Sequence, residues 1–278
     1  MPEGPEIRRA ADAVNAAIGG RKTIEVRFGL EHLQQFEPRL RNQLVTSVTS
    51  CGKAMLTRFD NGLTIYSHNQ LYGRWYICNP GNTPDTKRQL RLAIHNSKQS
   101  ALLYSASEIE VLDDNGIKQH PFLSRLGPDV LEQSTDNTLI LDRLSSKTFG
   151  RRRLGNLLTD QSFLAGMGNY LRCEILFVAS LHPTLRPCDC SRAQLTKLAE
   201  NIIGLARQSY TTAGITNNLE RAYQLKEGGT EFEDYRFHVF RRAGRSCYVC
   251  NEKIEKITSG SQACYLCPQC QRAGEQIF

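Results

Sequence analysis

The stretch CYVCNEKIEKITSGSQACYLCPQC, residues 247–270, contains two Cys-x2-Cys pairs. The pairs are separated by 16 residues, a spacing typical of a structural zinc site in which four thiolates surround the ion. A segment this short buries too little apolar surface to fold alone, so a bound metal would supply its folding free energy. The sequence therefore predicts one structural Zn2+ ion, held by Cys247, Cys250, Cys267 and Cys270.

The residues between the two pairs alternate in character and contain Ser-Gly-Ser at 259–261, which predicts a β-hairpin. Cys264 is an alternative ligand, because it lies three residues before Cys267. We favour Cys267 with Cys270, since only this choice gives two matched pairs. The other cysteines are expected to be ordinary core or surface thiols: Cys51, Cys78, Cys173, Cys188 and Cys190.

The composition indicates a folded protein with two domains of ordinary size: the chain has 278 residues, of which 40% are hydrophobic. Its net charge of +7 fits a polyanionic partner without identifying one. No apolar run is long enough to span a bilayer, and the first residues lack the apolar region of a signal peptide. We therefore expect a cytoplasmic protein that does not associate with membranes, in which the cysteines bind metal rather than form disulfides.

The hydrophobic pattern changes its period along the chain. Residues 6–18, EIRRAADAVNAAI, have the spacing of an amphipathic helix. From Lys22 to about Leu112 the period is two, and Asn61-Gly62 predicts a hairpin between two strands. Several short strands with frequent turns indicate a β-sandwich or a barrel.

The second half of the chain has mainly helical patterns over residues 138–210. Gly166 and Gly168 interrupt the middle of this region, which predicts two helices joined by a tight turn. Residues 211–235 show no periodicity, and we interpret them as a long loop or linker.

The first residues, MPEGPEI, carry groups suited to amine chemistry. If Met1 is removed, Pro2 becomes a secondary amine that can form an iminium with an aldehyde carbon. Glu3 lies beside it and Glu6 is one helical turn onward, so both carboxylates can face the amine. The alternative is that the two carboxylates only complement the N-terminus of a helix.

Four segments and the cysteine finger occur in the order of one family: PEGPEI at 2–7, CGKAML at 51–56, SHNQLYGRW at 67–75 and LLTDQSFLAGMGNYLRCEIL at 157–176. On these motifs the chain resembles the Fpg/Nei family of bifunctional DNA glycosylases, and within it the endonuclease VIII branch. The resemblance covers nearly the whole length and is weakest at residues 211–235.

The resemblance implies an α+β fold with an N-terminal helix and β-sandwich and a C-terminal helix-two-turn-helix domain that carries a β-hairpin zinc finger. The expected boundaries are 1–125 for the catalytic domain, 126–235 for the helical domain with its loop, and 236–278 for the finger. It also implies a monomer of the bacterial cytosol or nucleoid, and a double-stranded DNA partner containing oxidised bases or abasic sites.

The implied activity is excision of oxidised pyrimidines in base excision repair, followed by β,δ-elimination that nicks the strand. The resemblance makes Pro2 the nucleophile that attacks C1′ of an extruded nucleotide. Glu3 would shuttle protons, which requires a pKa well above that of a free glutamate. Glu6 would orient the amine, and Lys53 would contact the phosphate beside the lesion. Without the resemblance, Lys53 is simply a solvated lysine on a strand.

The resemblance also implies DNA contacts. In endonuclease VIII the triplet matching Gln70-Leu71-Tyr72 is a wedge that fills the space left by the extruded nucleotide. Asn169 and Arg172 are expected at phosphates near a helix N-terminus. Read without the family, Leu71 and Tyr72 are more typical of core packing, and Asn169 of a helix cap.

One position departs from the family. The finger normally carries an arginine in its hairpin turn, and the corresponding residue here is Gln262, which has no charge and no bidentate fork. Weaker engagement of the lesion, a cation supplied from elsewhere, or loss of glycosylase activity would follow. Two alternative functions remain open: a glycosylase of the same family for oxidised purines of the formamidopyrimidine or 8-oxoguanine type, since base preference also depends on residues 211–235, and, because of Gln262, a catalytically weak zinc-finger protein that binds DNA.

Overall fold

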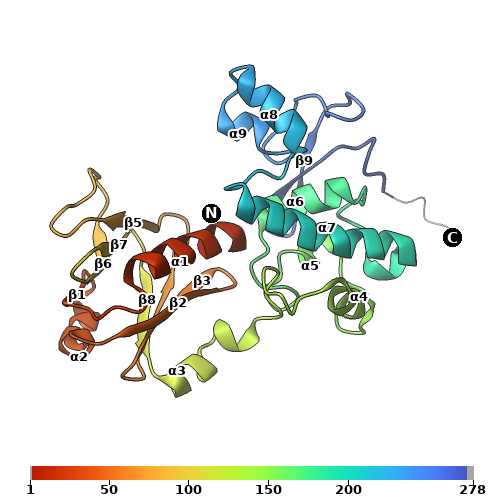
Figure 1. The fold of residues 1–278 in the computed structure, drawn as a ribbon. Helices are drawn as coiled ribbons and strands as arrows, with labels where there is room; N and C mark the ends of the chain where they lie inside the picture. Colours follow the sequence, from red (N-terminus) through yellow and green to blue (C-terminus); the bar gives the residue numbers. More distant parts are fainter. Residues whose placement is uncertain (1, 274–278) are drawn as a thin grey trace. The chain divides into compact units, whose positions relative to one another are not determined.

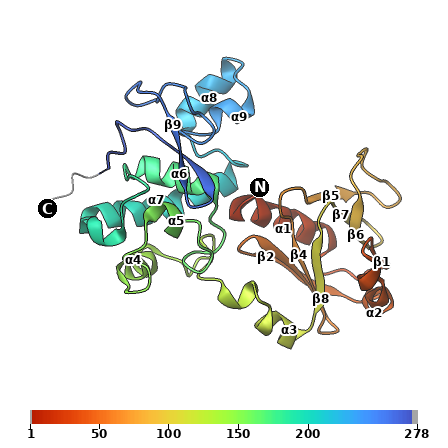
Figure 2. The same cartoon turned by 180° about the vertical axis from the view of Figure 1, so that it is seen from behind.

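The computed structural model describes residues 2–273, and it divides the chain into two compact units, residues 1–125 and 126–278. The first unit is an N-terminal helix with a β-sandwich, and the second is helical with a C-terminal β-hairpin (Figures 1 and 2). The expected α+β fold is confirmed. Among the helices of residues 2–273, none combines the length and the apolar character needed to cross a bilayer.

Two four-stranded antiparallel sheets form the sandwich of the first unit. The sequence pattern was consistent with either a sandwich or a barrel. Because the strands form two separate sheets, the fold is a sandwich. One sheet has the order β2-β3-β4-β8, with β2 (Val45–Cys51), β3 (Ala54–Phe59), β4 (Thr64–His68) and β8 (Glu108–Leu112). The other has the order β1-β6-β7-β5, with β1 (Glu25–Phe28), β6 (Leu90–His95), β7 (Ser100–Tyr104) and β5 (Arg74–Cys78).

Helix α1 (Gly4–Ile18) packs on strands of both sheets. Its apolar stripe, which includes Ala11, Val14 and Ile18, is buried in the same hydrophobic cluster as residues of the sandwich. The helical period of the sequence therefore correctly predicted which side of α1 is buried. Short helical segments complete the unit: η1 (Glu31–Phe36), α2 (Glu37–Leu40), α3 (Asp114–Gln119) and η2 (Leu123–Arg125).

Three connections meet at one end of the sandwich. Ala54, which follows the turn between β2 and β3, is opposite His68 at the end of β4. His68 is in turn opposite Glu108 at the start of β8, so these three strand ends lie at the same edge. Residues 69–73 then pass from β4 to β5 in the other sheet, and residues 105–107 return from β7 to β8. At the opposite end, Asn61-Gly62 joins β3 to β4, as the sequence predicted.

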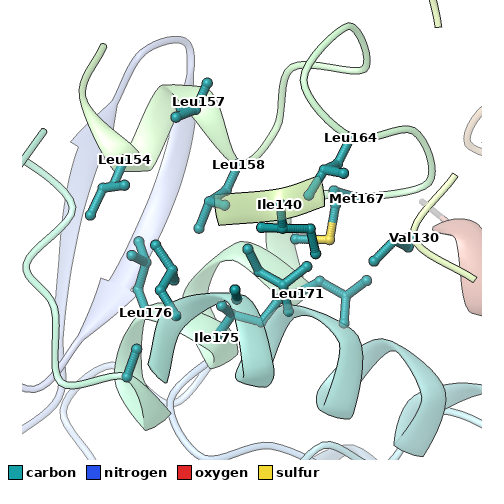
Figure 3. Close-up of a cluster of buried hydrophobic side chains, with 14 of the residues drawn as sticks. Val130, Ile140, Leu154, Leu157, Leu158, Leu164, Met167, Leu171, Ile175 and Leu176 are labelled. Carbon is teal, nitrogen blue, oxygen red and sulfur yellow. The ribbon is translucent and has the colours of Figure 1, made fainter. Parts of the chain in front are cut away.

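The core of the second unit is formed by aliphatic side chains from several helices (Figure 3). Ile140, Leu157, Leu171 and Leu176 are all 0% exposed. The predicted helical region contains α4 (Asn137–Ser145), α5 (Leu154–Leu157), α6 (Asn169–Val178), η3 (Pro187–Asp189) and α7 (Arg192–Thr211). The break around Gly166 and Gly168 lies before α6, and residues 158–168 are not helical, so the connection is longer than the predicted tight turn.

The interpretation of residues 211–235 as a long loop is wrong. This stretch contains α8 (Leu219–Glu227) and α9 (Phe232–Tyr235). Asn218 caps α8 by accepting a hydrogen bond from the backbone N–H of Arg221. Ala222 is the one buried residue of α8, but Leu219, Ala222 and Tyr223 have helical spacing, so the sequence contains a short helical signal that the interpretation as a loop overlooked.

The predicted hairpin is present as β9 (Glu255–Ser259) paired with β10 (Gln262–Leu266). It packs against α6 within the second unit, where Cys173 and Phe177 of the helix share a buried cluster with Ile254 and Cys264 of the finger. The finger therefore packs on α6 through this hydrophobic cluster.

Candidate functional site

The beginning of α1 brings the acidic residues of MPEGPEI together. Glu6 Oε2 accepts a hydrogen bond from the backbone N–H of Glu3 at 3.0 Å, and Glu3 is only 3% exposed. Pro2 directly precedes this capped turn and is partly exposed. Met1 lies outside the described residues, and its expected removal therefore stays a prediction.

Lys53 lies in the turn between β2 and β3, next to Gly52, which has a φ of +58°. The lysine is 8% exposed, and this burial lowers its pKa, while the carboxylates of Glu3 and Glu6 act in the opposite direction. The lysine and both carboxylates therefore interact electrostatically at the N-terminal end of α1. Residues far apart in sequence are thus brought into one charged cluster.

The segment Gln70–Tyr72, which we call the wedge segment, connects the two sheets. Leu71 and Tyr72 are 61% and 68% exposed, so the interpretation of these residues as core does not hold. Gly73 donates a backbone hydrogen bond to the carbonyl of Asn69 at 2.7 Å, and a Cβ at Gly73 would collide with the backbone of Asn69. The tight connection thus projects two large apolar side chains into solvent.

Gln70 has a φ of +48°, an unusual conformation for a residue with a side chain. Its backbone N–H donates to His68 Nδ1 at 3.1 Å, and its side-chain Nε2 donates to Glu108 Oε2 at 3.0 Å. Burial lowers the pKa of His68, which lies near both Glu108 and Lys53. His68 and Glu108 were not predicted from the sequence, because their proximity depends on the pairing of β4 with β8.

In the second unit, Asn169 is the first residue of α6 and Arg172 lies one turn later. Arg172 is 1% exposed and donates from Nη2 to Asn169 Oδ1 and to the carbonyl of Ala263, the latter at 2.9 Å. Its Nη1 donates to the carbonyl of Gly155 at 3.0 Å. The guanidinium is thus buried among acceptors from Asn169, α5 and the hairpin, and the expected contact of Arg172 with a phosphate stays a prediction.

Gln262 is exposed at the start of β10, directly opposite Ser259. The hairpin turn lies against α5, because a Cβ at Gly155 would collide with Ser259 Oγ. The Arg172 hydrogen bonds to Asn169 and Ala263 therefore bring the start of α6 and the residue next to Gln262 together. Arg172 therefore contacts Asn169 directly and reaches the hairpin through Ala263, the residue after Gln262.

The four predicted zinc ligands are clustered. The Sγ atoms of Cys247, Cys250, Cys267 and Cys270 all lie within 4.8 Å of one another. The Cys250–Cys267 and Cys247–Cys270 sulfur pairs are 3.4 and 3.9 Å apart. A tetrahedron with Zn–S bonds of about 2.3 Å has edges of roughly 3.8 Å, so these thiols fit a closed site. Cys264 lies apart from this set, with its Sγ 3.8 Å from Cys173 Sγ.

Two sequence models of known domains match the chain. The formamidopyrimidine-DNA glycosylase N-terminal domain matches residues 1–107, and the formamidopyrimidine-DNA glycosylase H2TH domain matches residues 126–220. The chain belongs to the formamidopyrimidine-DNA glycosylase family. The resemblance seen in the sequence motifs is thereby confirmed.

Curated relatives in this family include two proteins named Endonuclease 8, from Salmonella arizonae and Salmonella heidelberg. They are 45% and 46% identical to this chain over 272 residues, which covers 98% of this chain and 100% of each relative. The similarity therefore spans both units and the finger.

Solved structures of the family share the fold. A Lactococcus lactis Fpg complex with DNA containing FAPY-dG has a TM-score of 0.78 and 17% identity, covering 97% of this chain and 99% of that chain. A complex of the LlFpg protein with THF-DNA and an inhibitor has a TM-score of 0.80 and 18% identity, covering 98% of this chain and 100% of that chain. At these identities the likeness establishes the fold alone.

Proposed function

We propose that this chain is a DNA glycosylase and AP lyase of the endonuclease VIII type, which excises oxidised pyrimidines and then nicks the DNA strand. The single observation that carries the proposal is the electrostatic cluster of the buried Lys53 and Glu3 with the half-buried Glu6, at the helix start that directly follows Pro2 in the chain. Its full-length similarity to proteins named Endonuclease 8 supports the same activity.

The amine of a processed Pro2 is the nucleophile. Its nitrogen attacks C1′ of the damaged nucleotide, and the glycosidic C–N bond breaks as the base leaves with the electron pair and takes up a proton. The nitrogen loses its proton and is then bonded to C1′, and cleavage of the C1′–O4′ bond, with a proton taken up by O4′, opens the sugar ring and forms the iminium. Loss of a C2′ proton breaks the C3′–O bond, a second elimination breaks the C5′–O bond and releases the other phosphate, and water hydrolyses the iminium.

Glu3 moves protons during ring opening and elimination, since its carboxyl is buried next to the nucleophile. Glu6 fixes the chain at this point through its hydrogen bond to the N–H of Glu3. Lys53 places a positive charge where the phosphate beside the lesion would lie. Its partial desolvation strengthens an interaction with an anion.

The wedge segment replaces the extruded nucleotide. Leu71 and Tyr72 supply apolar and aromatic surface in place of the lost base stacking, and their exposure leaves them available for insertion. The amide of Gln70 contacts the base that has lost its partner. Extrusion is required because C1′ is not accessible for attack within a stacked duplex.

The second unit binds the phosphates of double-stranded DNA that contains oxidised bases or abasic sites. Asn169 at the N-terminus of α6 and Gln262 on the hairpin are the proposed contacts, and Arg172 positions both. Cys247, Cys250, Cys267 and Cys270 hold one Zn2+ ion, which supplies folding free energy to the finger. We further propose that the protein acts as a monomer in the bacterial cytoplasm.

The proposal is tested by parallel excision assays on duplexes that contain thymine glycol or 8-oxoguanine, with protein whose Pro2 terminus is confirmed by mass spectrometry. We expect faster excision of thymine glycol and nicking of abasic DNA. Preference for 8-oxoguanine would assign the chain to oxidised purines. DNA binding without any nicking would instead indicate a non-catalytic DNA-binding protein.

A further inference from the structure

We propose that Ser107 and Glu108 are positioning residues that fix the orientation of the Gln70 amide, and thereby decide how the enzyme reads the base opposite the lesion. This inference rests on the proposed wedge function of Gln70. It adds a specificity determinant outside the wedge segment, because Ser107 lies on the connection from β7 to β8 and Glu108 is the first residue of β8.

Both ends of the Gln70 amide have protein partners. Gln70 Nε2 donates to Glu108 Oε2 at 3.0 Å, and Ser107 Oγ donates to Gln70 Oε1 at 2.8 Å. An ionised carboxylate can only accept hydrogen bonds, so Glu108 requires the amide nitrogen, not the oxygen, on its side. Ser107 completes the arrangement by donating to the oxygen.

Glu108 itself is held in place. Its second carboxylate oxygen, Oε1, accepts a hydrogen bond from the hydroxyl of the fully buried Tyr66 at 3.0 Å. Its backbone belongs to β8, opposite His68 on β4. The anchor for the amide is therefore a strand residue in the sheet, which is more precise than a loop residue.

The backbone of Gln70 is also restrained. Its φ of +48° and the hydrogen bond from its N–H to His68 Nδ1 at 3.1 Å define the direction in which the side chain leaves the chain. With the backbone fixed, rotation of the amide by half a turn would break the hydrogen bond to Glu108 and place the amide oxygen against its carboxylate, whereas the Ser107 hydroxyl could reverse its direction and accept from the amide nitrogen. The flipped orientation is strongly disfavoured.

The two hydrogen bonds to Ser107 and Glu108 leave part of the hydrogen-bonding capacity of the Gln70 amide unused. A primary amide has two N–H donors and two acceptor lone pairs, and the protein uses one of each. One donor and one acceptor are left in a fixed order for the edge of an unpaired base. A base whose edge offers the complementary order is favoured, whereas a freely rotating amide would accept either order.

The test compares nicking rates on duplexes with an abasic site opposite each of the four bases, and on a single-stranded abasic oligonucleotide. For the native protein we expect a preference among opposite bases. Glu108→Ala should reduce nicking of the preferred duplex by about 3–10-fold, the range for loss of one hydrogen bond, and flatten the preference. Ser107→Ala should reduce the same rate within that range but keep the order of preference, because Glu108 still fixes the orientation of the amide. Gln70→Ala should flatten the preference in the same way as Glu108→Ala.

Three controls separate positioning from general damage. Glu108→Gln should restore the preference, because its amide oxygen still accepts from Gln70 Nε2. Glu110→Gln, on the same strand, should resemble the native protein. Single-stranded nicking should be unchanged in the Ser107 and Glu108 variants, since a single strand has no opposite base.

The inference would be overturned by the absence of an opposite-base preference in the native protein, or by a preference that survives Glu108→Ala. An equal loss on duplex and single strand would also overturn it, because the effect would then be structural. Failure of the proposed function is distinguishable, since the native protein would then nick neither substrate.

Discussion

Arg172 on helix α6 donates a hydrogen bond from Nη2 to the backbone carbonyl of Ala263 on strand β10, at 2.9 Å. The same nitrogen also donates to Asn169 Oδ1, and Nη1 donates to the carbonyl of Gly155. One buried cation thus connects the start of α6, the start of α5 and the hairpin. The geometry of the proposed phosphate contacts depends on this residue.

Replacing Arg172 by lysine should therefore weaken both folding and DNA binding. A lysine has one ammonium and no planar fork, so at least one of the carbonyls of Gly155 and Ala263 loses its donor. Each such loss costs about 1–3 kcal/mol in the free energy of unfolding, and DNA affinity should fall about tenfold or more. Urea unfolding and fluorescence anisotropy with an abasic duplex measure the two effects. Arg207→Lys, at an exposed position on α7, is the control, and an equal affinity for both variants would contradict the positioning role.

Because Cys264 lies outside the cysteine cluster, variants of Cys264 and of Cys267 should differ in their zinc content. Cys264→Ala should retain one zinc ion per chain, because its sulfur lies near Cys173 rather than in the cluster. Cys267→Ala should lose the zinc, unfold the hairpin and abolish tight DNA binding. Elemental analysis of the purified proteins gives the stoichiometry. Equal zinc loss in both variants would show that Cys264 is a ligand.

The charged cluster at the start of α1 predicts the titration of Lys53. Burial lowers the pKa of this lysine, and the carboxylates of Glu3 and Glu6 partly oppose that effect. Glu6→Gln removes one opposing charge, so the pKa of Lys53 should fall further below its ordinary value. NMR titration of the lysine Cε and Nζ nuclei measures this directly, with Glu31→Gln as a control. A rise in the Lys53 pKa on replacing Glu6 would contradict the assigned geometry.

Replacing one carboxylate oxygen of Glu174 on α6 by an amide nitrogen should strongly lower the free energy of unfolding. The carboxylate is fully buried and accepts hydrogen bonds from the Thr216 hydroxyl and from three consecutive backbone N–H groups, those of residues 238–240. Glu174→Gln places an NH2 group among these donors and should lower the free energy of unfolding by about 2–4 kcal/mol. Thr216→Val removes one donor and should cost only about 1 kcal/mol. Chemical denaturation that finds the two variants equally stable would refute this ranking.

The zinc ligands and the first helix could be predicted because local chemistry determines them. The spacing of Cys247, Cys250, Cys267 and Cys270 follows from the geometry of a tetrahedral ion, and the period of residues 6–18 follows from burial of one helix face. Neither requires knowledge of distant parts of the chain.

The partners of Gln70 and Arg172 could not be predicted in this way. Glu108 reaches Gln70 only because β8 pairs with β4, and a strand pairing between distant segments leaves no local signal. Arg172 lies in a motif that suggests a surface charge, but its acceptors come from α5 and β10. Helices α8 and α9 were missed because they are short and mostly exposed.

The proposed mechanism requires the amine of Pro2 to become covalently joined to deoxyribose, and borohydride trapping on abasic DNA captures this bond. The iminium is reduced to a stable amine, and mass spectrometry of the digested complex locates the joined residue. We predict a single cross-link at Pro2, in protein that lacks Met1. A cross-link at a lysine, or normal strand scission by protein that retains Met1, would contradict the account.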